Sequence, residues 1–214
     1  MLTIKYYSTI YILFFSIIVC AQTNEEKLKE INNVAVRMFA NMNNRDYNAI
    51  IDMTHPKVFE IAPKESIKEL FKSMFEGNED MTINVPKTNP DYKLSKLYIN
   101  EKDSVDYAFI SYDMKMDMTF HTQEFKDEEK SMMKTMMKSK GINVTFISNN
   151  KLDLFMQDRV TIILKDNFTN GKWVMVNYDP DSPLFFQILP ESLLDNAKAY
   201  HQDLLLKQKK DKEE

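Results

Sequence analysis

The chain has 214 residues and a formal net charge of −4 at pH 7, and its only cysteine is Cys20. This acidic balance argues against nucleic acid as a partner, because tight binding to phosphates requires a cationic surface. The only arginines are Arg37, Arg45 and Arg159, so few side chains can form bidentate hydrogen bonds with a phosphate or carboxylate.

The first residues have the pattern of an exported protein. Lys5 precedes an apolar run from Ile10 to Val19, which is about half the length that a helix needs to cross a bilayer. Val19-Cys20-Ala21 then places short side chains where signal peptidase cleaves, which predicts a signal peptide over residues 1–21. We therefore expect a periplasmic or extracellular protein with no integral membrane span after cleavage. Lipidation of Cys20 is the alternative, but the branched Val19 before it matches the lipoprotein motif poorly.

Cleavage after residue 21 would also remove the only cysteine. The mature chain would then have no disulfide and no thiolate metal site. Its stability would come from a hydrophobic core, which residues 22–206 are numerous enough to form as a single domain. Residues 207–214 are almost all charged and are predicted to be a disordered tail.

Helical spacing of apolar side chains predicts three helices in the first part of this domain. The first spans residues 24–43, and the second spans residues 47–53 and ends at His55-Pro56, because the residue before proline avoids the helical region. The third begins at Pro63 and ends at Gly77.

The pattern then changes to the alternation of strands. Two further helices are expected, a Met-rich one inserted over residues 123–139 and a C-terminal one over residues 191–206. The predicted strands are 81–85, 92–99, 105–121, 142–148, 151–165 and 172–178.

The two longest strands show the clearest alternation. In strand 105–121 one face is expected to be dry and the other wet, with Ile110, Tyr112, Met114, Met116, Met118 and Phe120 on the dry face and Ser111, Asp113, Lys115, Asp117, Thr119 and His121 on the wet one. In strand 151–165 the apolar residues that share parity, and so are expected to share a face, are Leu152, Leu154, Met156, Val160, Ile162 and Leu164.

The order of these elements resembles a known superfamily. Three helices followed by long strands that end in Asn170-Gly171-Lys172-Trp173-Val174-Met175-Val176 resemble the nuclear transport factor two-like (SnoaL-like) superfamily over roughly residues 25–178. The resemblance implies a bent sheet that wraps a helical layer into a cone with an internal pocket. The inserted Met-rich helix and the C-terminal helix depart from this pattern. We predict an α+β fold, in which an N-terminal helical layer packs on a curved antiparallel sheet.

No motif identifies a reaction. The three glycines cannot build a phosphate-binding loop, and we expect no cofactor. Under the resemblance, the candidates for a pocket are His55, Asp46, Tyr47, Tyr112 and Arg159. Asp46 also fits the role of a helix cap, and His55 that of a turn residue bonded to nearby backbone.

Three functions remain open. Because the superfamily holds enzymes, binding modules and proteins of no known activity, the fold alone cannot choose among them. The first expectation is a non-catalytic exported module that binds an apolar small molecule or a partner protein. The second is a dehydratase- or isomerase-like enzyme in which His55 or a tyrosine is the general base. It requires His55 to point into a cavity, with a carboxylate or tyrosine hydroxyl within about 3.5 Å.

The third function is Cu(I) handling by methionines. Thioethers are soft ligands that suit Cu(I), and the candidate ligands are Met114, Met116, Met118, Met132 and Met136. The strand methionines share parity with Ile110 and Phe120, which favours a role in the core instead. We expect buried, dispersed sulfur atoms and no metal site.

Overall fold

The computed structural model describes the backbone of residues 3–210 and the side chains of residues 24–210. The side chains of the predicted signal peptide, and residues 211–214 of the predicted tail, lie outside this description. Among the residues described, no helix combines the length and the apolar character that a membrane span needs.

The N-terminal helices follow the predicted pattern. Helix α1 (Thr3–Asn44) contains the predicted helix 24–43 and is followed by α2 (Tyr47–Asp52), a single-turn α3 (Val58–Ile61) and α4 (Lys64–Glu76). Asp46 caps α2, since its Oδ1 accepts the backbone N–H of Ala49 at 3.0 Å. The cap role predicted for Asp46 is therefore confirmed, whereas α3 was not predicted.

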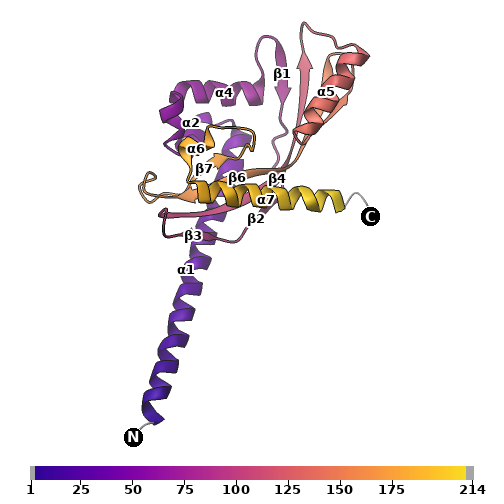
Figure 1. Cartoon of the computed structure of the whole chain (residues 1–214). Coiled ribbons are helices and arrows are strands. Elements are labelled where there is room, and N and C mark those ends of the chain that lie inside the picture. Colours follow the sequence, from indigo (N-terminus) through magenta and orange to yellow (C-terminus); the bar gives the residue numbers. More distant parts are fainter. Residues whose placement is uncertain (1–2, 211–214) are drawn as a thin grey trace.

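Seven strands form one open antiparallel sheet around two long central strands (Figure 1). Strands β1, β2 and β3 line up along the outer side of β4, and β5 and β7 line up along the outer side of β6. Their bounds are β1 (Met81–Asn84), β2 (Tyr92–Leu94), β3 (Tyr98–Asn100), β4 (Val105–Phe120), β5 (Ile142–Phe146), β6 (Lys151–Lys165) and β7 (Val174–Asn177).

The single strand predicted over residues 92–99 was wrong, because β2 and β3 are separate. Ser95 separates them, as its hydroxyl accepts the backbone N–H of Phe109 at 2.9 Å. The backbone N–H of Ser95 donates to the carbonyl of the same Phe109 at 2.9 Å. A side-chain oxygen thus replaces a backbone carbonyl in the ladder, which interrupts the strand.

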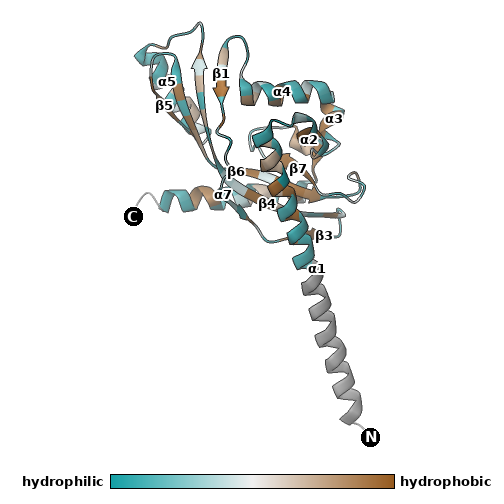
Figure 2. Cartoon of the chain, turned by 180° about the vertical axis from the view of Figure 1, so that it is seen from behind, coloured by the Kyte–Doolittle hydropathy of each residue, from teal (hydrophilic) through white to brown (hydrophobic). Residues whose placement is uncertain are grey.

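Helices cover both faces of one end of the sheet. Helices α1 and α2 pack on one face, with Met38 and Ile50 against Ile110 and Ile163. On the opposite face lie α6 (Phe185–Ile188) and α7 (Glu191–Lys210), which continues beyond the predicted end at Leu206. Strand β7, enclosed between them, is largely hydrophobic (Figure 2). The predicted α+β fold with an N-terminal helical layer is confirmed.

At the other end of the sheet, helices bury the strand side chains less completely. The inserted helix α5 (Asp127–Ser139) starts four residues later than predicted, where Oε2 of Glu129 accepts the backbone N–H of Lys126 at 2.7 Å. Met133 of α5 and Phe75 of α4 reach a cluster of strand side chains around Met116 and Leu154. Many members of this cluster are only half-buried.

The prediction that β4 has one wet face was wrong for its first half. Tyr107, Phe109 and Ser111 are all buried there, because α7 covers the face that was expected to be wet. Beyond this helix the predicted alternation returns, and Asp113 and Lys115 are exposed.

The prediction that the alternate residues of β6 share one face was also wrong. Tyr112 of β4 pairs with Arg159, whereas Met114 pairs with Met156, so β6 has one extra residue in a β-bulge. Asp158 adopts a φ of 50° in this bulge. Residues before the bulge, such as Met156, pack beneath α4, and residues after it, such as Val160, pack against α7.

Candidate functional site

A cleft with a volume of about 410 Å³ opens beside the bulge. Its walls come from the end of α1, from α4, from β4 and β6, and from the loop over residues 85–91. We call it the main cleft because of its aromatic lining, although the more open hollow between α1 and Trp173 is larger, about 830 Å³. Four aromatic rings line it, those of Phe39, Phe75, Tyr112 and Phe155, together with Met42 and Met114. Apolar walls with a few polar groups are typical of small-molecule sites, and their volumes are about 300–1,000 Å³.

Arg45 fixes the loop that closes one side of the main cleft. Its guanidinium donates to the carbonyl of Met42 and to that of Val85, both at 2.7 Å, and lies 5.0 Å from the centre of the Phe75 ring. Further along the loop, the side chain of Asn43 donates to Oδ1 of Asn89 at 2.7 Å. The loop is therefore tied to the end of α1 at two points.

Tyr112 lies where the main cleft meets a second, smaller one. The second cleft has a volume of about 210 Å³, and Asp91, Tyr112 and Asp113 line both. The Tyr112 ring packs edge-on against Phe39, with 5.0 Å between ring centres. Its side chain is only 6% exposed, and its hydroxyl has no hydrogen-bond partner among the residues described. Of the predicted pocket residues, the main cleft contains Tyr112.

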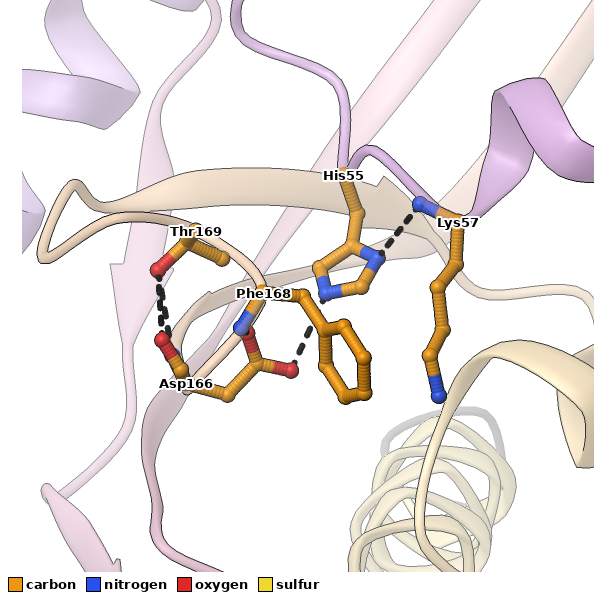
Figure 3. A network of polar contacts seen from close by, with 5 residues as sticks. All are labelled: His55, Lys57, Asp166, Phe168 and Thr169. Atoms are coloured by element: carbon orange, nitrogen blue, oxygen red, sulfur yellow. Dashed lines mark hydrogen bonds and ion pairs between the residues drawn. The ribbon is translucent and has the colours of Figure 1, made fainter.

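His55 lies elsewhere, in a buried contact between two loops (Figure 3). Its Nδ1 accepts the backbone N–H of Lys57 at 3.3 Å, so Nε2 carries the proton and donates it to Oδ2 of Asp166 at 3.1 Å. Burial lowers the pKa of His55 below its usual value of 6.5, and the hydrogen bond to Asp166 opposes this shift only in part. The imidazole is therefore neutral at pH 7.

Phe168 and Lys57 complete the surroundings of His55. The Phe168 ring lies 6.5 Å from the imidazole, edge-on, and the Lys57 ammonium lies 3.9 Å from the centre of the same phenyl ring. His55 itself is 0% exposed. The carboxylate that a general base requires is present, but both ring nitrogens are occupied. The arrangement serves packing, and the predicted bond of His55 to nearby backbone is confirmed.

The remaining pocket candidates are dispersed. The Tyr47 hydroxyl donates to Oε1 of Glu76 at 2.8 Å, and its pKa is raised by burial and then by that acceptor. Arg159 is half-buried and pairs with Tyr112 across the β4–β6 ladder, but it lines neither cleft. The structure thus brings no two of these side chains together as an acid–base pair.

The methionines are divided between the core and the surface. Met116 is buried, with 9% of its surface exposed, whereas Met114 and Met118 are only half-buried. On α5, Met132 and Met136 are 68% and 52% exposed and stay outside the cluster that contains the strand methionines. Within residues 24–210, no three His, Cys, Asp or Glu side chains gather as a metal site would require.

Sequence reasoning missed most of the main cleft. Phe39 and Phe75 lie in the core patterns of two helices, whereas Phe155 alternates with the apolar residues of β6, so no local pattern joins the three. Arg45 adopts a φ of 57°, which is uncommon for a residue with a long side chain. Pro86 and Pro90, between the predicted strands 81–85 and 92–99, are the one local signal, because prolines there mark a loop.

The chain was compared with protein-family models, with curated proteins and with solved structures, and none of the three comparisons found a match.

Proposed function

We propose that this chain is an exported, non-catalytic module that binds an apolar small molecule in the main cleft. The observation that carries the proposal is the cleft itself, about 410 Å³ in volume and lined by four aromatic rings and two methionines. Methionine side chains adapt to ligands of different shapes, because they are unbranched and flexible. The resemblance to the nuclear transport factor two-like superfamily, in which a pocket is common, is in line with this proposal.

The surroundings of His55 favour binding over catalysis. An enzyme of the dehydratase or isomerase kind needs a base that can reach a substrate proton. His55 is buried and hydrogen bonded at both nitrogens, and it is not among the residues that line the main cleft. Tyr112 is in the cleft, but within residues 24–210 its hydroxyl forms no hydrogen bond to a carboxylate or imidazole, so it serves better as a hydrogen-bond donor to a ligand.

Isothermal titration calorimetry with decanol, which has an apolar chain and a neutral headgroup, tests the proposal. Decanol should bind the wild-type protein, and Met114→Trp should abolish binding because the larger side chain fills the cleft. Met132→Trp is the matched control, since Met132 is 68% exposed on α5, and should bind as the wild type does. Native mass spectrometry of the protein from its own host should also show a co-purifying molecule. A bare polypeptide together with no binding of decanol would refute the proposal.

A partner protein is the second candidate, and α4 favours it. Leu70 and Met74 are one turn apart on this helix and are 56% and 43% exposed, which leaves part of its apolar face uncovered. A photo-crosslinking amino acid at position 70 should then capture one partner in the host. The same group at Lys72, an exposed position on the opposite side of the same helix, should not. Equal labelling from both positions would contradict this candidate.

A further inference from the structure

The polar groups of the main cleft indicate one chemical class of ligand. We propose that the cleft binds an apolar carboxylate, such as a medium-chain fatty acid, and that Arg45 and the hydroxyl of Tyr112 hold its headgroup. The inference rests on the proposed function, because it names the ligand of the same cleft.

Arg45 is a cation without an acidic partner in the wall of the cleft. Its side chain is half-buried, and within residues 24–210 it forms no ion pair with a carboxylate. The two carbonyls of Met42 and Val85 use two of its N–H groups, and a guanidinium has five. The remaining donors have the planar geometry that matches a carboxylate.

Tyr112 supplies a second donor in the same cleft. Its hydroxyl forms no hydrogen bond within residues 24–210, and because no buried side-chain polar atom in that range lacks a partner, this oxygen must reach solvent at the cleft. A ligand oxygen in the cleft would accept this hydrogen bond in place of water. In this proposal one carboxylate oxygen accepts from Tyr112 and the other from Arg45, since both residues line the same cleft.

The other charged residues of the cleft are at its rim. Asp91, Asp113 and Lys115 are all exposed, and Oδ1 of Asp113 already accepts the backbone N–H of Asp158 at 2.9 Å. Exposed charges are screened by water and salt. The half-buried guanidinium therefore decides the sign of the headgroup, while the rings of Phe39, Phe75 and Phe155 accept the apolar part.

The test compares three ligands with the same ten-carbon chain: decanoate, decanol and decylammonium. By calorimetry at pH 7.5, we expect decanoate to bind the wild-type protein about tenfold more tightly than decanol, because hydrogen bonds to an ionised group are roughly twice as strong as neutral ones. Decylammonium should bind most weakly. Salt should weaken the binding of decanoate but not that of decanol.

Two variants locate the headgroup. Tyr112→Phe removes one oxygen atom and retains the ring, and it should lower the affinity for decanoate roughly fivefold. Arg45→Met should make decanoate no better a ligand than decanol. If circular dichroism shows that Arg45→Met is unfolded, Tyr112→Phe and the salt dependence still decide the question.

The outcomes separate this inference from the proposed function. Equal affinities for decanoate and decanol, both abolished by Met114→Trp, would overturn the carboxylate inference and leave the proposed function standing. Tightest binding of decylammonium would overturn it too, and would point to Asp91 and Asp113 as the partners of the headgroup. Failure of all three ligands to bind would refute both.

Discussion

The imidazole of His55 donates to the carboxylate of Asp166 across 3.1 Å, although 111 positions separate the two residues in the chain. The backbone on either side of this contact is also paired. The N–H of His55 donates to the carbonyl of Met175 at 3.1 Å, and the N–H of Met175 donates to the carbonyl of Met53 at 2.7 Å. The contact therefore closes a junction between the segment after α2 and the hairpin of β6 and β7.

Removal of the imidazole should destabilise this junction. We expect His55→Ala to lower the free energy of unfolding by about 3 kcal/mol, because it leaves a cavity and a largely buried Asp166 without its donor. Urea denaturation followed by circular dichroism measures the change. His121→Ala, at an exposed position, should cost no more than about 1 kcal/mol. Similar losses for the two variants would argue against a special role of the His55–Asp166 contact.

The same histidine predicts how stability depends on pH. Its pKa in the folded protein lies below 6.5, so the unfolded chain takes up a proton first as the pH falls. Stability should therefore be full above pH 6.5 and decline below it, by at most about 1.4 kcal/mol per pH unit for each such histidine. Asp166, Lys57 and Glu60 are the charged groups that act on His55.

Denaturation curves between pH 7.5 and pH 5.5 measure this decline. His55→Gln should show a shallower dependence than the wild type, because one of the titrating groups is gone. Some slope should remain, because burial also lowers the pKa of His201. A variant with the same slope as the wild type would exclude His55 as a source of the pH dependence.

Gly77 is the glycine whose replacement should be most damaging. It ends α4 with a φ of 83° and a ψ of −160°, a region open almost only to glycine, and an added Cβ would overlap the carbonyl of Met81. We expect Gly77→Ala to cost at least about 3 kcal/mol. Gly141 has a φ of 75° and open space around it, so Gly141→Ala should cost only about 1 kcal/mol. Equal losses in thermal denaturation would mean that the overlap with Met81 is relieved at little cost.

The bulge beside the main cleft depends on one side chain of β4. Asp158 is the extra residue of β6, and its backbone N–H donates to Oδ1 of Asp113 at 2.9 Å. Asp113→Ala should lower the free energy of unfolding by about 1 kcal/mol, whereas Asp113→Asn keeps an acceptor and should cost less. Urea denaturation distinguishes the two, and equal losses would mean that this hydrogen bond does not stabilise the bulge.

This bulge also shows where sequence reasoning stops. The bounds of β6, Lys151–Lys165, agree with the prediction because alternation and turn residues are local signals. The extra residue at Asp158 leaves no such signal, since an aspartate and not a glycine adopts the positive φ, and it reverses the face of every side chain after it. The His55–Asp166 contact and the main cleft were missed for a related reason: their residues meet only in the folded chain.

The last prediction concerns the oxidation of the methionines, which should be fast at exposed positions and slow at packed ones. Dilute hydrogen peroxide must reach a sulfur atom to oxidise it, so exposed methionines react first. Met132 and Met136, 68% and 52% exposed, should be converted to sulfoxides early, and peptide mass spectrometry can follow each site. Met116, 9% exposed within the cluster of Phe75 and Leu154, should react only when the domain opens.

The consequences for stability should differ in the same way. A sulfoxide at Met132 or Met136 meets water and should leave the unfolding transition unchanged, whereas one at Met116 places a polar group in a packed cluster and should destabilise the domain. Met132→Leu and Met136→Leu remove two of the early sites, with Met74, 43% exposed, as a third, and should leave the slow phase as it was. If Met116 reacted as fast as Met132, its sulfur would be accessible, and a role of the strand methionines in packing would be contradicted.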